Sequence, residues 1–416
     1  MNGNKRRERA AAGKLVPGAG LAVVVFVVLG FCLNTAVRMP CYDVCGLDIG
    51  RMYGDRGIDH AHAPYIDRDL EYPPLIGVVM YAATVPFDHG YRNPFLVNMV
   101  LLTGLAAVTT WVLWRRDGSR AWRWALAPPL LVQGLQNWDL LSVATATIAL
   151  YVWEGGYAAS AGLLLGVGTA AKLYPALFVP ILAAASLGRR QGRKAAALVV
   201  GAVVGFGAVV VPVYARAPDS LGYLLRFHRD RGPDRGSIWY FVFRGPTLRT
   251  WLHEDVLVHV VTMLSVVIMG AAMLALVIAV ARVRISPVAA CALATIVCLA
   301  SSKIYSPQYD LWIVPFFVLL PVRRKLVGHF YVASFLVFVL TASDDHFLHR
   351  PTSGYLLGIA VAYRFVVLLL VAAEIIRTRR RPEPDRIVTI DEPGDGTREE
   401  ALALGPGLRS TRFVDI

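Results

Sequence analysis

The chain has 416 residues, of which 56% are hydrophobic and 17% are charged. Soluble domains are about 45–50% apolar and about 25% charged, so this composition excludes an ordinary soluble enzyme. The net charge of +13 does not indicate a nucleic-acid partner, because most Lys and Arg residues stand at the ends of apolar blocks, where they set membrane topology.

The apolar residues fall into blocks of roughly 15–25 residues, and about 20 apolar residues make one helical crossing of the hydrocarbon layer. Backbone groups in lipid must be bonded within the segment, so these blocks are predicted to be helices. The alternating segments that mark an outer-membrane barrel are not found in the sequence. The sequence therefore predicts an all-α polytopic protein of the cell membrane.

The first apolar block, residues 16–37, follows a basic segment at residues 5–14. It is longer than the core of a signal peptide and has no convincing small-residue cleavage site, so we expect a retained span. The tail 1–15 is then cytoplasmic, and the chain emerges outside from residue 39. Cys41 and Cys45 would lie in an oxidising compartment, where a disulfide between them is one alternative.

The next apolar run, residues 72–87, decides the topology. If it spans the membrane, the basic loops 115–123, 189–194, 282–284 and 323–325 all lie outside. If it lies along the outer interface as an amphipathic helix, these loops and the basic residues 377–381 all lie inside. The positive-inside rule favours the interfacial helix, with both termini cytoplasmic.

About twelve spans then form one transmembrane domain, residues 16–376. After the first block they are predicted at 94–114, 122–136, 138–153, 157–171, 175–188, 195–214, 256–281, 286–302, 309–322, 326–342 and 354–376. The external parts are predicted at 39–93, 137–139, Lys172, 215–255, 303–308 and 343–353. Residues 377–416 are charged and rich in Pro and Gly, which predicts a disordered cytoplasmic tail.

Two lysines are predicted on the outer side, where the positive-inside rule does not place them. Lys172 precedes Leu-Tyr-Pro, and Lys303 precedes Ile-Tyr-Ser-Pro. Snorkelling would explain one such lysine, but two favour fixed cations that bind an anion. Asp139, at another external turn, either binds substrate hydroxyls or pairs with a lysine.

The two long external segments are rich in charged residues. Segment 39–93 contains Asp43, Asp48 and Glu71, and its aromatic and proline residues favour a structured surface over a solvated loop. Segment 215–255 is basic and aromatic, which suits a phosphate with a sugar ring or, alternatively, a charged lid. Its candidates for phosphate binding are Arg226, His228 and Arg244.

A series of short motifs occurs in one order between residues 40 and 310. They are Cys45-Gly46-Leu47-Asp48-Ile49, Gly54-Asp55-Arg56-Gly57, Pro64-Tyr65-Ile66-Asp67-Arg68-Asp69-Leu70-Glu71-Tyr72-Pro73-Pro74-Leu75, Asn137-Trp138-Asp139-Leu140-Leu141, Gly166-Val167-Gly168-Thr169-Ala170-Ala171-Lys172-Leu173-Tyr174-Pro175, Gly236-Ser237-Ile238-Trp239-Tyr240 and Lys303-Ile304-Tyr305-Ser306-Pro307-Gln308-Tyr309. With them the chain resembles the GT-C superfamily of polyprenyl-phosphate-sugar-dependent glycosyltransferases. Within it the chain resembles glycosyltransferase family 87, the alpha-mannosyltransferase-like group.

The resemblance implies a GT-C-like helical bundle whose external first loop carries an interfacial helix. It also implies a hexosyltransferase that transfers a sugar, here mannose, from a polyprenyl-phosphate donor to an external glycan or glycolipid acceptor. The superfamily's first-loop Asp acts as general base, which carries that role to Asp48, with Asp43 as the alternative. No cofactor besides the donor substrate is implied.

The residues agree with this chemistry. Inversion by single displacement needs one carboxylate to take the acceptor proton, and a phosphate leaving group needs cations rather than a strong acid. Lys172, Lys303 and an Arg within 226–244 would supply the cations, and no metal cluster is required. The candidates for binding the sugar are Glu71, Asn137, Asp139, Tyr305 and Gln308.

Three alternatives remain at the level of sequence. A lipid-linked-sugar flippase would need charged residues inside several spans, whereas most charges here are at span ends. A non-catalytic scaffold would not need two misplaced lysines and an acidic loop. A GT-C enzyme that uses arabinose or glucose donors would share the same lipid phosphate.

Overall fold

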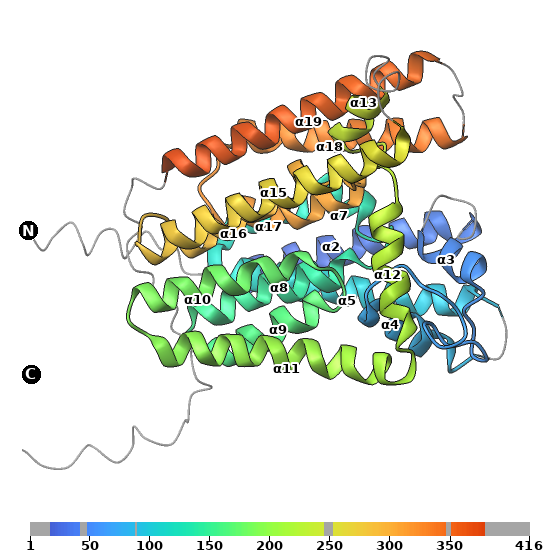
Figure 1. Ribbon diagram of the computed structural model, residues 1–416, viewed down its shortest axis with the longest axis horizontal. Coiled ribbons are helices and arrows are strands. Elements are labelled where there is room, and N and C mark those ends of the chain that lie inside the picture. The colour runs from blue at the N-terminus through green and yellow to red at the C-terminus, as the bar shows by residue number, and fades with distance from the viewer. Residues whose placement is uncertain (1–16, 42–47, 88–89, 245–252, 347–350, 379–416) are drawn as a thin grey trace, which may run out of the picture.

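The structure, a computed structural model, describes residues 17–41, 48–87, 90–244, 253–346 and 351–378. Within these ranges the regular elements are helices, joined by turns and by two isolated β-bridges in the first loop. Figure 1 shows the long helices running side by side as one bundle. This confirms the all-α prediction for the described part of the chain.

The α-helices are α2 (Pro17–Arg38), α3 (Asp48–Arg56), α4 (Pro74–Thr84), α5 (Arg92–Asp117), α6 (Trp122–Ala125), α7 (Pro128–Gln133), α8 (Asp139–Glu154), α9 (Ala158–Thr169), α10 (Phe178–Gly188), α11 (Gly192–Arg216), α12 (Asp219–Asp230), α13 (Ile238–Arg244), α15 (Glu254–Ala281), α16 (Pro287–Ser301), α17 (Val314–Leu319), α18 (Arg324–His346) and α19 (Pro351–Thr378). Short 3-10 turns are η1 (Met39–Cys41), η2 (Gly118–Ala121), η3 (Tyr174–Leu177) and η4 (Pro307–Trp312).

Six helices in the described ranges are long and apolar enough to cross a membrane. They are Gly18–Arg38, Arg92–Ala125, Gly192–Arg216, Asp255–Ala281, Arg324–Ala342 and Gly354–Thr378. Four shorter apolar helices accompany them: Pro74–Thr84, Ala158–Thr169, Tyr174–Gly188 and Pro287–Ser301. The chain is therefore a multi-pass membrane protein, while the count of about twelve spans stays a prediction.

Two of the predicted spans are each broken into two short pieces. Segment 122–136 forms α6 and α7, because Pro128 removes a backbone donor and holds Ala127 in an extended conformation with ψ 121°. Segment 309–322 forms η4 and α17, with Pro315 at the start of the second piece. The six residues of α7 or of α17 are too few to cross the hydrocarbon layer as one helix.

The helices α9 and α11 touch backbone to backbone. A Cβ on Gly162 would lie 2.0 Å from the carbonyl oxygen of Leu198, and one on Gly166 would lie 2.2 Å from that of Ala202. Gly201 and Gly205 make the reciprocal contacts from α11. Small residues four apart allow this close approach of membrane helices, and the contact fixes the end of α9 that leads to Lys172.

The two ends of the bundle differ in charge. The α10–α11 and α15–α16 connections, which carry Arg189, Arg190, Arg282 and Arg284, lie at one end with the last residues of α19 (left in Figure 1). We call this the basic end. Ion pairs and hydrogen bonds bring further basic residues together with neighbouring segments there: Arg116 with Glu154, Arg123 with the carbonyl oxygens of Phe317 and Val322, and Arg323 with Glu374.

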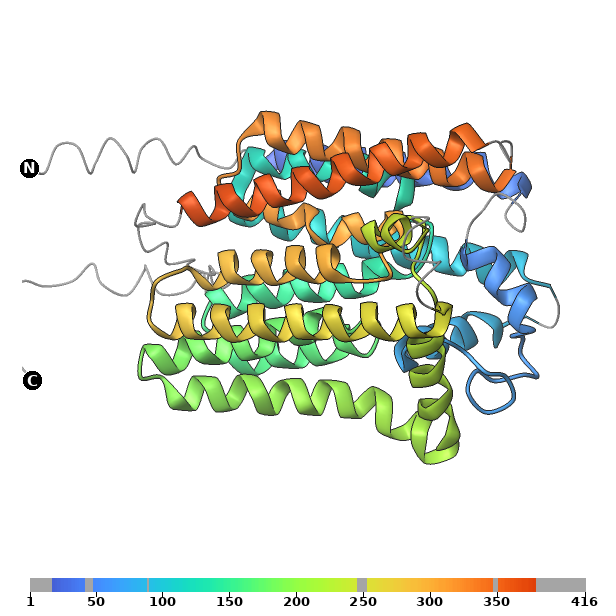
Figure 2. The same ribbon diagram turned by 45° about the horizontal axis from the view of Figure 1, so that its top comes forward.

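The opposite end, which we call the site end, carries α3, α4 and α12 (right in Figure 1). Figure 2 shows α12 crossing the ends of α11 and α15 rather than running along the bundle. The eleven residues of α4 extend about 16 Å at 1.5 Å per residue, about half the hydrocarbon thickness. Its length alone therefore does not make it a spanning helix.

Candidate active site

Asp48 begins α3 and receives hydrogen bonds from two distant segments. The Nδ2 amide of Asn137 lies 3.5 Å from Oδ2 of Asp48, and the Nε2 amide of Gln308 lies 3.4 Å from the same oxygen. The backbone of Ile49 donates to the carbonyl oxygen of Gln136 at 3.3 Å, which holds α3 against this turn. Three segments far apart in sequence thus meet at one carboxylate.

The carboxyl of Asp48 is held in a low-dielectric but accessible place. Burial raises its pKa, while the positive charges of Arg51 and Lys172 and the hydrogen bond from Asn137 oppose that shift. The side chain is still 22% exposed, and the nearest guanidinium nitrogen of Arg51 is 3.8 Å away. A carboxylate with a raised pKa and an open approach suits a general base.

Lys172 lies in a cage of aromatic rings and one carboxylate. Its ammonium nitrogen is 4.9 Å from the ring centres of both Tyr72 and Tyr309, and 3.5 Å from Oδ1 of Asp139. Burial lowers the pKa of Lys172, but Asp139, Tyr309 and Asp48 outweigh this and raise it overall. Lys172 therefore stays a fixed cation next to Asp48, and it is only 7% exposed.

Asp139 is buried and connects the Lys172 cage to Trp312 and Asn137. Its Oδ1 accepts a hydrogen bond from Nε1 of Trp312 at 2.9 Å, and its backbone N–H donates to Oδ1 of Asn137 at 2.9 Å. The Trp312 ring stacks between Tyr174 and Tyr309, with ring centres 4.4 Å and 4.3 Å apart. The Oδ2 oxygen of Asp139 has no hydrogen-bond partner among the described residues.

Glu71 joins the first loop to α12. Its Oε1 lies 2.8 Å from the guanidinium of Arg56, and its carbonyl oxygen lies 3.0 Å from Nε2 of His228. Its Oε2 is buried and has no partner within the described ranges. The backbone of Leu75 donates to the carbonyl oxygen of Ala170 at 2.9 Å, which brings this segment to the turn of Lys172.

Lys303 has different neighbours from Lys172. Its Nζ donates to the carbonyl oxygen of Arg229 at 2.7 Å, and its own carbonyl oxygen accepts from the backbone of Asp234 at 2.9 Å. Burial lowers the pKa of Lys303, Asp230 opposes the shift, and Arg231 adds to it. The guanidinium of Arg231 lies 3.5 Å from Oδ2 of Asp234, and its charge acts on both Lys303 and Tyr309.

Tyr305 belongs to a buried cluster that the sequence analysis missed. Its hydroxyl donates to Oδ1 of Asp310 at 2.5 Å, and Oδ2 of Asp310 is 3.2 Å from Nη1 of Arg364. Arg364 lies within α19 and, like Asp310, is fully buried. Burying an Arg inside an apolar, membrane-spanning block costs free energy unless the Arg is paired. The presence of Arg364 in such a block was therefore the sequence signal that could have revealed the cluster.

Three of the predicted site residues, Arg226, Arg244 and Asp43, remain to be placed. Arg226 is exposed on α12, and its guanidinium lies beside Gly222 of the same helix. The side chains of Arg244 and Cys41 lie outside the described part of the chain, as do the residues Asp43 and Cys45. Among the described residues, no three His, Cys, Asp or Glu side chains are placed to hold a metal ion.

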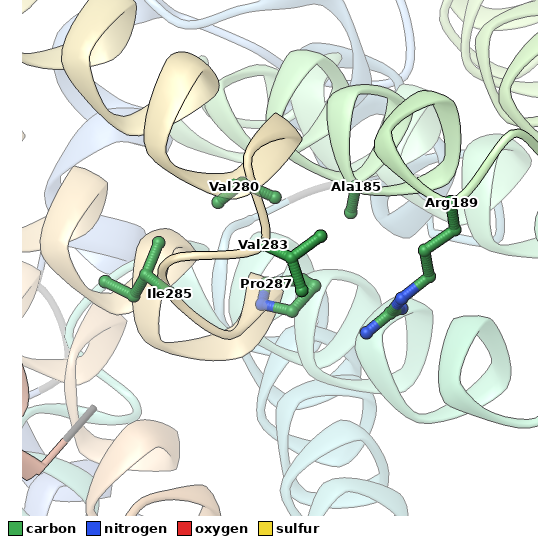
Figure 3. Close-up of a pocket in the computed structure, with 6 residues that line it drawn as sticks. All are labelled: Ala185, Arg189, Val280, Val283, Ile285 and Pro287. Carbon is green, nitrogen blue, oxygen red and sulfur yellow. The ribbon is translucent and has the colours of Figure 1, made fainter. Parts of the chain in front are cut away.

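A recess at the basic end is separate from these residues. It encloses about 180 Å³, part of it open solvent, between the ends of α10 and α15. Figure 3 shows Arg189, the residue after α10, extending toward the α15–α16 connection, where the other labelled side chains are apolar. The candidate site lies at the other end of the bundle.

In the described part of the chain, the helical bundle carries at one end the carboxylate of Asp48, the caged cation of Lys172 and two buried carboxylate oxygens without a partner. A model of glycosyltransferase family 87 matches residues 70–307. This is more than half of the chain, and the chain belongs to glycosyltransferase family 87. No curated protein matches it. The match includes Lys172 and Lys303 and begins after Asp48, so the role of Asp48 depends on the geometry.

Proposed function

We propose that this membrane glycosyltransferase transfers mannose from a polyprenyl-phosphate donor to a glycan or glycolipid acceptor outside the cell membrane, with Asp48 as general base. The observation that carries the proposal is the environment of Asp48. Its Oδ2 is oriented by Asn137 and Gln308, and its nearest cations, Arg51 and Lys172, leave it partly exposed.

The proposed reaction is a single displacement. An acceptor hydroxyl attacks the anomeric carbon, its proton passes to Asp48, and the bond from that carbon to the phosphate oxygen breaks. The electron pair of the broken bond leaves with the polyprenyl phosphate. A β-linked donor therefore gives an α-linked product, with one carboxylate and without a second acid.

The donor phosphate is proposed to bind between Lys172 and Lys303. Arg231, whose charge acts on Lys303 and on Tyr309 beside Lys172, would add a third cation, and His228 and Arg226 would add further polar groups from α12. Preorganised cations stabilise the charge that develops on a leaving phosphate, and they need not reorganise during the reaction.

The sugar hydroxyls are proposed to be bound by Glu71, Asp139 and Asn137. Glu71 and Asp139 each have one buried carboxylate oxygen without a protein partner in the described ranges, and such oxygens are costly unless something else bonds them. Tyr305 instead donates to Asp310, so we propose that it supports the site from behind.

The site end is proposed to face outward. The positive-inside rule puts the basic end in the cytoplasm, with both termini there and α4 as the interfacial helix of the first loop. About twelve spans would then complete a GT-C-like bundle, in which the shorter apolar helices cross together with their neighbours.

The test uses the full-length protein in lipid nanodiscs with an octyl α-mannoside acceptor. Polyprenyl-phosphate mannose, glucose and arabinose are offered separately, and the products are separated and their anomeric configuration determined by NMR. The proposal expects an α-mannoside from the mannose donor at a rate at least tenfold above the other two. Faster transfer from another donor, or a β-linked product, contradicts it.

A liposome measurement separates transfer from transport. Labelled donor is placed in one leaflet with the protein and without acceptor. Appearance of the label in the other leaflet, with no new glycosidic bond in the nanodisc assay, would favour a flippase.

A further inference from the structure

We propose that Arg364 is a positioning residue: through Asp310 and Tyr305 it fixes the segment 305–310 so that Gln308 reaches Asp48. The inference rests on the proposed function of Asp48 as base. It concerns a residue that lies outside the family match, within α19.

The Arg364 guanidinium bonds to three residues in two parts of the chain. Its Nη1 lies 3.2 Å from Oδ2 of Asp310, and its Nη2 donates to the carbonyl oxygens of Gly236 at 2.6 Å and Tyr305 at 3.3 Å. Its Cζ lies over the Tyr305 ring, 3.7 Å from the ring centre. A lysine, with a compact ammonium group, cannot reproduce this forked arrangement.

The cluster is poorly explained as a source of stability. A buried ion pair recovers little more than the cost of removing its charges from water, and an apolar replacement is often as stable. Arg364 and Asp310 are both fully buried, with Arg364 in a helix apolar enough to span the membrane. What the pair provides is a fixed geometry for the backbone that it holds.

That backbone leads to Asp48. Gln308 stands two residues before Asp310 in η4, and its Nε2 donates to Oδ2 of Asp48. On the other side, a Cβ on Gly236 would lie 2.2 Å from the carbonyl oxygen of Tyr305, so the α12–α13 connection rests directly on the same segment. Arg364 therefore holds two segments in place: the segment 305–310, whose Gln308 bonds to Asp48, and the connection that follows α12.

The structure also shows how the effect can be read. A hydrogen bond to a carboxylate favours its charged form, so losing the bond from Gln308 raises the pKa of Asp48 further. The other charged or titratable groups that act on Asp48 are Arg51 on its own helix, Lys172, Asp139 and Tyr72. None of these contacts the Arg364 guanidinium, so their effect should stay constant.

The experiment measures protonation of Asp48 directly. A protonated carboxyl gives its proton to a carbodiimide nitrogen and its oxygen adds to the central carbon, which forms an O-acylurea. Mass spectrometry of the full-length protein in nanodiscs gives the labelling midpoint of Asp48 against pH. Arg364→Lys and Gln308→Ala should each raise the midpoint by about half a pH unit. The double variant should match Gln308→Ala alone. An unchanged midpoint in Arg364→Lys, or a further shift in the double variant, overturns the inference.

Two additional variants guard against general damage. Tyr305→Phe removes only the hydroxyl that donates to Asp310 and should shift the midpoint in the same direction. Arg116→Lys weakens a partly buried pair at the basic end and should leave the midpoint unchanged; a shift there equal to that of Arg364→Lys counts against the inference. Labelling needs no turnover, so a wild type that transfers no sugar refutes the proposed function without deciding this test.

Discussion

The ammonium nitrogen of Lys172 lies 3.5 Å from Oδ1 of Asp139, in a place where both side chains are buried. The rings of Tyr72 and Tyr309 add cation–π contacts that stabilise the ammonium group. The pair joins the turn after α9 to the start of α8, and its energetics should show in the stability of the protein.

Asp139→Asn should therefore destabilise the fold, because it leaves a buried ammonium without its carboxylate. Breaking one partner of a buried pair costs about 3–5 kcal/mol. The unfolding midpoint in detergent should fall clearly, and the double variant Lys172→Met/Asp139→Asn should recover most of the loss. An Asp139→Asn protein that unfolds at the wild-type temperature would show that the pair is not energetically coupled.

The pH dependence of transfer should report the environment of Asp48. A base acts only when deprotonated, so kcat/KM should fall as the pH drops through a pKa that lies above the usual value of 3.8. Removing the cation in Lys172→Met should raise the pKa of Asp48, so this fall in kcat/KM, the acid limb of the pH profile, should move to higher pH. The variant should also lower the rate. Lys194→Met, which alters a lysine over Trp153, is the control and should leave the limb in place.

The contact between His228 and the Glu71 carbonyl should contribute to donor binding by holding α12 over the first loop. One such hydrogen bond contributes about 1 kcal/mol, so His228→Ala should raise the KM for the donor about fivefold. His228→Gln, which keeps a donor group, should stay closer to wild type. Equal KM values for all three proteins would show that this contact does not matter for binding.

The backbone contact of α9 with α11 should tolerate no added carbon. Gly162→Ala introduces a Cβ into the carbonyl oxygen of Leu198, and overpacking of this kind costs about 1–3 kcal/mol. Gly104→Ala places its Cβ in open space on α5 and should be neutral or slightly stabilising. Similar unfolding midpoints for the two variants would contradict the close packing.

The sequence predicted those parts of the site that are marked by a polar or charged residue within an apolar block. The turns at Asn137, Lys172 and Lys303 were found because polar residues interrupt apolar blocks there, and the structure gathers all three at the site end. Glycosyltransferase family 87 was also identified from such motifs, and the family match confirms it. These signals are local in the sequence, so they can be recognised without knowing how the helices pack.

Long-range geometry was not predictable in the same way. Nothing in the sequence states that Lys172 is enclosed by Tyr72 and Tyr309, or that Lys303 bonds to the Arg229 carbonyl, because such contacts depend on helix rotation. The breaks at Pro128 and Pro315 were hidden by continuous apolar composition. Arg364 was overlooked because one charge barely alters the mean hydropathy of a long block.

The central claim is tested most directly by single-turnover transfer with Asp48→Asn and its matched control Asp69→Asn, an exposed carboxylate of the same loop. Both proteins are loaded with polyprenyl-phosphate mannose in nanodiscs and mixed with acceptor. General-base catalysis typically contributes about 10²–10⁴-fold, so Asp48→Asn should lose at least a hundredfold in rate while Asp69→Asn stays near wild type. An Asp48→Asn protein that transfers the sugar within a few-fold of the wild-type rate would contradict the assignment of Asp48 as the base.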